Sequence, residues 1–496
     1  MSTELLIEGR VGSSPRVLWN DGELSDDGLH ARVSQLAGEL VSRNLRCVAS
    51  RLDNGPDWLI LDLALRQRGM VHVPVPTFFS PGQVAHALSD SGAQALVSTD
   101  GAPLPDGAGS TASEALAPGL RLWRLNHASV TLPKDTACIT YTSGTTGAPK
   151  GVCLDEAALY RVAQSLAEAA RPLAPRRHLC LLPLSTLLEN VAGVYAALIA
   201  GAQIAVPGLA EIGYTGATGL DVPTLLACLH RYRPESAIVV PQLLLALVMA
   251  AERGAALPDS LRFLAVGGGR VGDSLLARAQ AVGLPVYEGY GLTECGSVVC
   301  LNRPDAIRPG SVGRPLQHAR VIVDEDGELH VDGVRCLSYL GADTLDPGPI
   351  ATGDLGRVDE DGFVYITGRR KNVFITAFGR NVSPEWVESE LLQHPAFAQA
   401  VVHGEARAFN VAVVWPRDAA LTDTQLRHAL NEVNVQLPDY AQVRDIVRAD
   451  AAFSVVDGLL TGNGRPRREA IFARYADAIE QRYQPPLTPL EAGASA

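Results

Sequence analysis

Lysine is scarce in this chain. Of its 42 basic residues three are lysine, namely Lys134, Lys150 and Lys371, and the others are arginine. Lysine carries a compact charge, whereas arginine carries a planar fork of donors, so the two are not interchangeable at a tight site. A lysine kept against this bias is therefore a candidate for a role that arginine does not fill.

Zinc-binding spacings are also absent from the sequence. There is no C-x-x-C pair and no H-E-x-x-H cluster, which argues against a zinc site. Scattered cysteines in a large chain are typical of reduced core residues, so we expect a cytoplasmic protein. The eight cysteines are Cys47, Cys138, Cys153, Cys180, Cys228, Cys295, Cys300 and Cys336.

Long apolar runs and a basic surplus are missing too. A membrane span needs roughly 20 consecutive apolar residues. The most apolar stretch, 181–206, does not reach this length without interruption, because Pro183, Glu189 and several polar residues interrupt it. The start, MSTELLIEGRVGSS, lacks the pattern of a signal peptide. A net charge of −12 argues against nucleic acid or anionic membranes as partners. We expect no membrane span, and a buried helix and strand at 181–206.

The chain of 496 residues predicts at least two domains, because single cores stop growing at about 250–300 residues. Helical spacing at 24–45 and near 80–90 alternates with apolar strands at 46–52, 70–75 and 94–98, which indicates an α/β fold. After about 305, short strands with Gly and Asp turns predict hairpins at 321–333 and 359–368. A smaller α+β unit follows, with a helix at 384–393.

Glycines and hydroxyls gather after the apolar strand 137–141, in the run YTSGTTGAPKG at 141–151. Glycines let successive backbone N–H groups form an anion nest, the hydroxyls add donors, and Lys150 adds a charge. The run is not a Walker A loop, which needs G-x-x-x-x-G-K-[ST]. It predicts a phosphate-binding loop, and a flexible surface loop is the alternative from composition alone.

This run resembles the phosphate-binding signature of the adenylate-forming superfamily, which includes acyl- and aryl-CoA synthetases and AMP-binding adenylation domains. Four further segments resemble its signatures in the same order: YEGYGLTE (287–294), GSVGRP (310–315), ATGDLG (351–356) and GRRKNVFITAFGRNVSPEWVE (368–388). The resemblance implies a large N-terminal domain of layered helices and sheets with a β-rich subdomain (1–368), a hinge (369–371) and a small mobile α+β C-terminal domain (372–496).

The resemblance also implies the reaction. Members form an acyl-adenylate from a carboxylic acid and ATP, release pyrophosphate and pass the acyl group to a thiol. Positioning and electrostatics dominate such chemistry. The implied catalytic residues are Lys150, Thr293, Glu294, Lys371 and Arg465, with Glu294 as the Mg²⁺ ligand and Lys371 at the hinge. The implied nucleotide-binding residues are Thr142, Ser143, Gly144, Thr145, Thr146 and Gly147 for the outer phosphates, and Gly268, Tyr290, Gly291, Asp354 and Arg369 for adenine, ribose or phosphate.

The acid pocket is expected around LPLSTLLENVAG (182–193), which resembles a family segment and carries Thr186 where many members carry histidine. No charged residue in it corresponds to an anchor for an α-amine, so a fatty or aryl acid is favoured. The expected pocket residues are Ser185, Asn190, Gly193, Gly289 and Gly296.

The family lysine that bridges the substrate carboxylate and the α-phosphate is missing. The segment LLTGNGRPRR (459–468) has Arg465 at that position. Three alternatives follow: Arg465 takes over the role with a different geometry, adenylation is slow or depends less on this residue, or the chain is a non-catalytic nucleotide-binding relative. The intact phosphate loop, Glu294 and Asp354 favour an enzyme.

The acceptor of the acyl group is open at this stage. Coenzyme A is the family default, and a separate acyl carrier protein or an amine are the alternatives; no pantetheine-attachment site appears near the end of the chain. A scaffold or sensor that binds ATP without turnover is the rival from another functional class.

Overall fold

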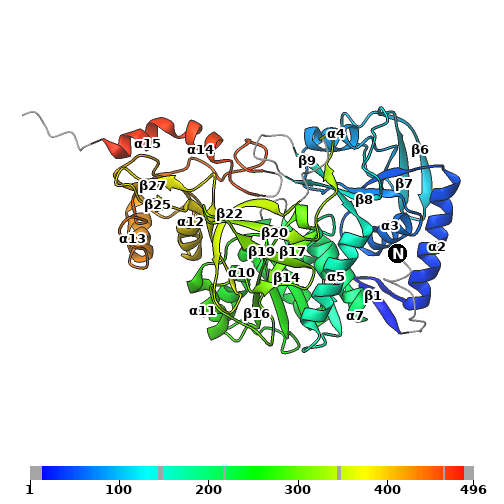
Figure 1. The fold of residues 1–496 in the computed structure, drawn as a ribbon, viewed down its shortest axis with the longest axis horizontal. Helices are drawn as coiled ribbons and strands as arrows, with labels where there is room; N and C mark the ends of the chain where they lie inside the picture. The colour runs from blue at the N-terminus through cyan, green and yellow to red at the C-terminus, as the bar shows by residue number, and fades with distance from the viewer. Residues whose placement is uncertain (1–13, 143–148, 216–218, 343–347, 462–463, 485–496) are drawn as a thin grey trace, which may run out of the picture. The chain divides into compact units, whose positions relative to one another are not determined.

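The computed structural model describes residues 14–142, 149–215, 219–342, 348–461 and 464–484, and the chain divides into two units, Met1–Ile366 and Thr367–Ala496 (Figure 1). Both units mix helices and strands, which confirms the α/β prediction for the larger unit and the α+β prediction for the smaller one. The hinge at 369–371 stays a prediction.

A nine-stranded sheet forms one half of the first unit. Its central strands, from β16 to β1, pair in parallel, and the strands at both edges pair antiparallel. Parallel strands covered on both faces read as nearly continuous apolar runs, which explains FLAV at 263–266. In sheet order the strands are β18 (Arg314–Pro315), β17 (Ser297–Leu301), β16 (Val286–Leu292), β15 (Phe263–Val266), β14 (Ser236–Val239), β10 (Arg177–Leu179), β11 (Gln203–Ala205), β1 (Pro15–Trp19) and β2 (Gly22–Ser25).

An eight-stranded sheet forms the other half of this unit. Its order brings the two-residue strand β21 beside β9, although the two lie far apart in the chain. In sheet order the strands are β21 (Ser338–Tyr339), β9 (Lys150–Asp155), β8 (Thr136–Thr142), β4 (Val71–Pro74), β3 (Cys47–Arg51), β5 (Ala95–Thr99), β7 (Leu120–Leu125) and β6 (Ser110–Ala117).

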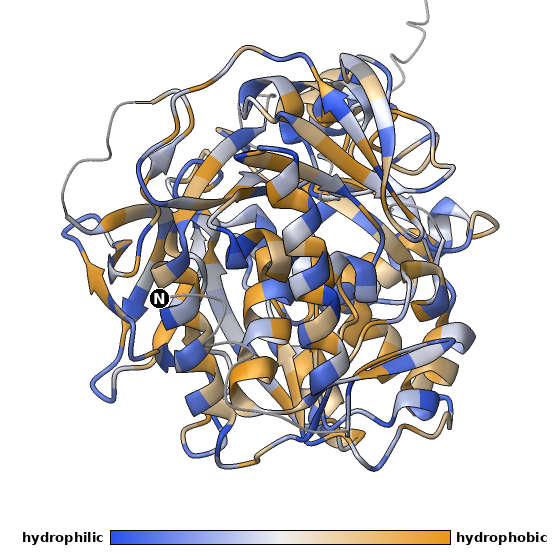
Figure 2. Ribbon diagram, turned by 90° about the vertical axis from the view of Figure 1, so that its right-hand side faces the viewer, coloured by the Kyte–Doolittle hydropathy of each residue, from blue (hydrophilic) through white to orange (hydrophobic). Residues whose placement is uncertain are grey.

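Helices between the two sheets share one core with both. Leu36, Leu61 and Val162 of three helices pack in the same cluster as Val48 of one sheet and Ile204 of the other. Figure 2 shows hydrophobic and hydrophilic residues on the same helices, as expected where one helix face packs inward. The central helices are α2 (Asp26–Ser42), α3 (Pro56–Gln67), α5 (Glu156–Ala170) and α7 (Ala196–Ala200); α9 (Val222–Tyr232), α10 (Pro241–Glu252), α11 (Asp273–Ala281) and α4 (Pro81–Asp90) cover the outer faces.

Local signals account for where these elements begin. Ser25 accepts a hydrogen bond from the Gly28 amide at the start of α2, and Ser80 and Gln83 form a capping box at the start of α4. The buried stretch 181–206 folds into helical turns and the strand β11, which confirms the prediction of a buried helix and strand there. Within the described residues, no helix is both long and apolar enough to cross a membrane.

The β-rich part of the chain is a four-stranded sheet of β19 (Ala319–Val323), β20 (Glu328–Gly333), β22 (Ile350–Val358) and β23 (Val364–Arg369). The two hairpins expected from the Gly and Asp turns are both present in it. A small two-stranded sheet of β12 (Tyr214–Thr215) and β13 (Gly219–Leu220) follows the helix α8 (Leu209–Ile212).

The second unit is built on the three-stranded sheet β26 (Phe397–His403), β27 (Asn410–Pro416) and β28 (Val443–Arg448). Side chains alternate along β27: Ala412 and Val414 pack under one pair of helices, and Val411 and Val413 pack under the other. The helices are α12 (Pro384–Gln393) and α13 (Asp423–Asn434) on the first face and α14 (Arg468–Arg474) and α15 (Ala476–Tyr483) on the second, and a hairpin of β24 (Phe374–Ile375) and β25 (Asn381–Val382) precedes them.

A fully buried polar network ties β3, α3 and β4 of the first unit together. Oδ1 of Asp62 lies 2.7 Å from Nδ1 of His72, whose Nε2 lies 2.7 Å from the Ser50 hydroxyl. The other carboxylate oxygen accepts from Arg66, 3.3 Å away, and from the hydroxyl of Tyr195. Burial alone would raise the pKa of Asp62, but the Arg66 charge and the hydrogen bonds from His72 and Tyr195 lower it to about 2. Asp62 is therefore charged at neutral pH.

Replacing Asp62 should destabilise the first unit strongly. We expect Asp62→Asn to lower the free energy of unfolding by about 3–5 kcal/mol, because Arg66 is left as an uncompensated buried charge. Urea unfolding followed by circular dichroism measures this. The matched control is Asp57→Asn, whose partner Arg32 lies 2.9 Å away with both side chains 39% exposed, and which should cost about 1 kcal/mol or less. Equal losses in the two variants would contradict the account.

Candidate active site

The strands β8 and β9 bring together the two ends of the predicted phosphate loop. Thr142, at the end of β8, pairs with Lys150, at the start of β9. The predicted loop residues between them lie outside the described residues: Ser143, Gly144, Thr145, Thr146 and Gly147. The Lys150 side chain is exposed, and its Nζ lies 5.7 Å from the centroid of the Tyr339 ring.

Tyr339 joins Lys150 to the predicted metal ligand. Its hydroxyl donates a hydrogen bond of 2.8 Å to Oε1 of Glu294. The backbone carbonyl of Glu294 accepts from the Cys336 amide at 2.6 Å, in the segment that leads into β21. Burial and the Glu294 carboxylate raise the pKa of Tyr339, so its hydroxyl stays protonated and able to donate. The sequence analysis missed this tyrosine, because only the pairing of β21 with β9 places it here.

Tyr290 and Asp354 meet at the predicted nucleoside end of the site. The Tyr290 hydroxyl donates to Oδ2 of Asp354 at 2.6 Å, and Asp354 is 4% exposed. The T-G-D motif holds this carboxylate in place: the Thr352 hydroxyl donates to the Leu329 carbonyl and accepts from the Asp354 amide. Gly353 takes a φ of 71°, a conformation that favours glycine. The predicted contacts with adenine and ribose stay predictions.

The predicted site residues between these two ends lie on one continuous segment of the chain. Strand β16 carries Tyr290 and Gly291 and ends at Leu292, and the short 3-10 helix η2 (Thr293–Cys295) with Thr293 and Glu294 follows directly. A Cβ on Gly291 would collide with the Ser297 carbonyl of the paired strand β17. Glycine at this position therefore lets the hairpin close.

Close neighbouring atoms or a left-handed backbone account for glycine at three other predicted positions. A Cβ on Gly289 would lie 3.1 Å from Cδ1 of Leu301, and one on Gly296 would lie 3.3 Å from Cγ2 of Val162. Gly268 and Gly296 both have a φ of 77°. These contacts give the glycines a backbone role, and their predicted roles in pocket depth and purine binding stay predictions.

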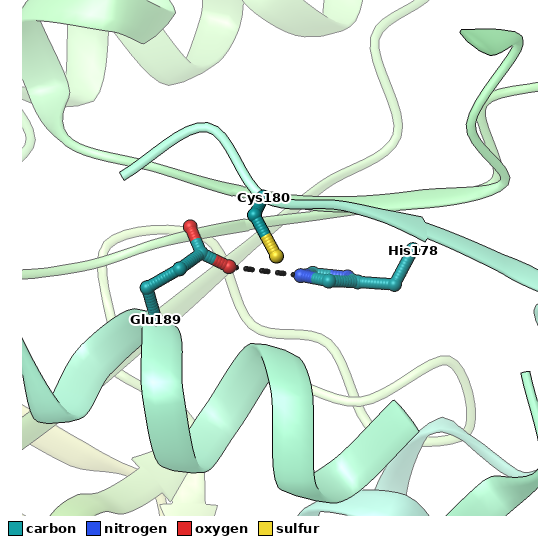
Figure 3. Close-up of side chains that lie close together, drawn as sticks. All are labelled: His178, Cys180 and Glu189. Carbon is teal, nitrogen blue, oxygen red and sulfur yellow. Dashed lines mark hydrogen bonds and ion pairs between the residues drawn. The ribbon is translucent and has the colours of Figure 1, made fainter. Parts of the chain in front are cut away.

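A buried carboxylate organises the predicted acid-pocket segment. Glu189, at the end of the helical turn α6 (Leu187–Glu189), is fully buried, and its Oε1 lies 2.9 Å from Nε2 of His178. Its Oε2 accepts from the Leu182 amide at 2.7 Å. Figure 3 shows the Cys180 sulfur beside this pair. Burial and the Glu189 carboxylate raise the pKa of the Cys180 thiol.

The chain then passes into a π-helical turn, η1 (Asn190–Tyr195). Such turns occur often at functional sites. A Cβ on Gly193 would lie 2.6 Å from Nε2 of His178 and closer still to Oε1 of Glu189. Asn190 is 2% exposed; its Nδ2 donates to the Tyr195 hydroxyl at 3.4 Å, and its Oδ1 has no hydrogen-bond partner among the described residues. Ser185, which precedes α6, is also buried.

Two clusters of the described residues bring three possible metal donors within 4.8 Å of one another, His178–Cys180–Glu189 and Asp324–Glu328–His330. In both clusters the carboxylates already accept hydrogen bonds from histidine or from backbone amides. Glu294 differs from them: its Oε2 has no hydrogen-bond partner among the described residues. Mg²⁺ is usually bound by one or two carboxylates, and phosphate and water oxygens complete its coordination shell. A single available carboxylate oxygen therefore suits Mg²⁺.

The remaining predicted residues belong to the second unit. Arg369 ends β23, and its carbonyl accepts from the Asn372 amide at 2.9 Å. Partial burial and the charge of Arg369 lower the pKa of Lys371, and Arg465 contributes in the same direction. Arg465 is exposed, and its carbonyl accepts from the Thr461 amide at 2.8 Å. The Arg465 amide also donates to the Thr461 hydroxyl at 3.1 Å, so Thr461 holds the main chain of Arg465.

Comparison with known proteins finds a family match over most of the chain. The family described as AMP-binding enzyme matches residues 12–335, and its C-terminal domain matches residues 371–486. A long-chain-fatty-acid–CoA ligase, FadD15 of Mycobacterium bovis, is 27% identical over 86% of this chain and 86% of its own.

Solved structures share the fold over nearly the full length. The anthranilate CoA ligase AuaEII, in complex with anthranoyl-AMP, has a TM-score of 0.78 and 19% identity, covering 96% of this chain and 98% of its own. The o-succinylbenzoate coenzyme A synthetase of Bacillus subtilis, in complex with ATP and magnesium ion, has a TM-score of 0.73 and 23% identity, covering 95% and 99%.

The fit around Gly193 gives a test of the acid-pocket segment. We expect Gly193→Ala to lower the free energy of unfolding by about 1–3 kcal/mol, because the new methyl group overpacks the His178–Glu189 pair. The matched control is Gly38→Ala in α2, where a Cβ meets nothing within 4 Å and where alanine should stabilise the helix by about 0.5–1 kcal/mol. Urea titrations compare the two variants. A neutral Gly193→Ala would show that this segment is not closely packed.

Proposed function

This chain belongs to the AMP-binding enzyme family, and on that premise we propose that it activates a carboxylic acid with ATP. The carboxylate attacks the α-phosphate, giving an acyl-adenylate and pyrophosphate. A thiol, most simply that of coenzyme A, then attacks the acyl carbon and releases AMP. Both steps need a polyanion to be held and its charge offset, which positioned donors and cations provide.

One observation carries this proposal: the segment from Tyr290 to Glu294 is held at both of its ends by residues that suit a nucleotide. At one end Tyr290 and the buried Asp354 form a polar pair suited to ribose hydroxyls. At the other, Glu294 lies beside Tyr339, over whose ring Lys150 sits at the end of the predicted phosphate loop. These contacts support a site in which one short stretch of chain would contact both the adenosine and the phosphates.

The local charges resolve the apparent conflict between a polyanionic substrate and a net charge of −12. Lys150 supplies a cation where the outer phosphates would lie, and Glu294 offers Mg²⁺ its Oε2, which has no hydrogen-bond partner among the described residues. When bound, the metal ion would offset phosphate charge. Backbone N–H groups of the phosphate loop would add donors without adding formal charge.

An apolar acid, fatty or aryl, is the proposed substrate class. Glu189 is the acidic side chain in the predicted pocket segment. One of its carboxylate oxygens contacts His178, and the other accepts from the Leu182 amide. It is therefore not available to anchor the amine of an amino acid. The fatty-acid specificity in the name of the 27%-identical relative is consistent with this class.

For the second unit we propose that Arg465 supplies the charge that offsets the developing negative charge at the α-phosphate. It retains the charge of the lysine found in relatives and presents more donors, in a planar arrangement. Lys371 is proposed as the residue on which this unit changes orientation between the two steps. Coenzyme A is the proposed acceptor, with a separate carrier protein or an amine as the alternatives that product analysis separates.

Pyrophosphate release tests the first step. With ATP, Mg²⁺ and a panel of fatty and aryl acids, we expect release that requires both the acid and the metal. Lys150→Ala and Glu294→Ala should each lower the rate by about 10²–10³-fold, because each removes a group that offsets phosphate charge. Lys134→Ala is the matched control, since Lys134 is an exposed lysine of the same unit outside the site and should leave the rate unchanged. ATP binding without release for any acid in the panel would favour a binding protein.

Arg465 can be tested by replacement in both directions. We expect Arg465→Ala to lower pyrophosphate release by about 10²-fold or more, and Arg465→Lys to retain most of it because the charge stays. Arg467→Ala, two positions further along the same exposed segment, controls for the loss of an arginine from this turn. The rate of pyrophosphate release is measured for each variant with each acid, in samples quenched at successive times. An Arg465→Ala enzyme as fast as the wild type would show that adenylation does not depend on this residue.

A further inference from the structure

We propose that Tyr339 is a positioning residue that holds Glu294 in the orientation in which its carboxylate binds Mg²⁺, and that also supports Lys150. The inference rests on the proposed function and adds a residue to it. It comes from the pairing of β21 with β9, because no sequence motif singles out Tyr339.

The hydrogen bond divides the two oxygens of Glu294 between two tasks. Oε1 accepts from the Tyr339 hydroxyl at 2.8 Å. Oε2 has no hydrogen-bond partner among the described residues, so it is available to bind a cation. Partners that hydrogen-bond to a metal-binding carboxylate orient it and are often worth 10–100-fold in metal affinity.

The backbone of Glu294 is held by the same segment. Its carbonyl accepts from the Cys336 amide at 2.6 Å. Both the side chain and the main chain of Glu294 are therefore bonded to residues 336–339. A single side-chain contact could arise from surface packing, whereas two contacts from one short segment indicate that this segment sets the position of the carboxylate.

Tyr339 is itself fixed to the strand that carries Lys150. The Leu337 amide donates to the Cys153 carbonyl and the Leu340 amide to the Gly151 carbonyl, each at 2.8 Å. The Lys150 ammonium then lies 5.7 Å from the centroid of the Tyr339 ring, within the range of a cation–π contact. One side chain thus links the proposed metal ligand to the lysine at the end of the phosphate loop.

Tyr339→Phe separates the two contacts, because phenylalanine keeps the ring beside Lys150 and loses only the hydroxyl. Calorimetric titration with ATP, without acid, gives the Kd in EDTA and in Mg²⁺ for each variant. We expect the Kd in EDTA to be unchanged and the tightening caused by Mg²⁺ to fall about ten-fold. Tyr365→Phe is the matched control, since the Tyr365 hydroxyl also bonds a carboxylate, Asp359, at 3.1 Å, away from the site.

A double mutant distinguishes positioning from general stability. In a Glu294→Gln background the further change Tyr339→Phe should have no effect on the response to Mg²⁺, because the carboxylate that it orients is gone. An equal loss in both backgrounds, or an equal loss of ATP affinity with and without Mg²⁺, would overturn the positioning role.

The same titrations separate failure of this inference from failure of the proposed function. A wild type that binds ATP more tightly with Mg²⁺, beside a Tyr339→Phe variant with the same response, contradicts only the role of Tyr339. A wild type whose ATP binding ignores Mg²⁺ and which releases no pyrophosphate contradicts the proposed function itself.

Discussion

Two hydrogen bonds from tyrosine to carboxylate hold the stretch on which the rest of the site depends. Tyr290 donates to Asp354 at 2.6 Å, and Tyr339 donates to Glu294 at 2.8 Å. Hydrogen bonds to an ionised acceptor are shorter and roughly twice as strong as neutral ones. They join the end of β16 to the four-stranded sheet and the helix η2 to β21, which pairs with β9. On the proposed function, these hydrogen bonds would orient two carboxylates that otherwise repel a nucleotide, Asp354 toward ribose hydroxyls and Glu294 toward a cation.

Much of the fold could be predicted from local pattern. Helical spacing, apolar runs and Gly–Asp turns predicted α2, α4, α12 and the two hairpins, because each depends on residues close together in the chain. The predicted nucleotide-binding residues of β16, η2 and the T-G-D turn likewise lie in contiguous segments. Tyr339 could not be found in this way, since its place depends on the pairing of a two-residue strand with β9 across a long stretch of chain.

Burial explains what the sequence left ambiguous in the acid-pocket segment. Glu189 sits among apolar residues in the sequence, and its spacing does not indicate that His178 will pair with it, because the two lie on different elements, β10 and α6. Gly193 was predicted for pocket depth. In the structure, the closeness of that pair leaves no room for a side chain there. No spacing or residue pattern in the sequence predicted the π-helical turn.

Because lysine is scarce, arginine carries most of the positive charge of this chain. Lys150 and Lys371 are lysines at positions where the resemblance implies a function. At position 465, where the family has a lysine, this chain has arginine. A guanidinium presents a flat array of donors and stays charged at any working pH. On the proposed function, a site that takes the Arg465 side chain would have to accommodate a wider cation than lysine.

The fate of the carboxylate oxygens tests the central claim most directly. An acid that supports turnover can be labelled with ¹⁸O in its carboxyl group and converted with ATP and the acyl acceptor. Attack of the carboxylate on the α-phosphate, followed by cleavage of the acyl–oxygen bond, predicts one labelled oxygen in each AMP and none in the pyrophosphate. Label in inorganic phosphate, or unlabelled AMP formed together with product, would contradict acid adenylation by this chain.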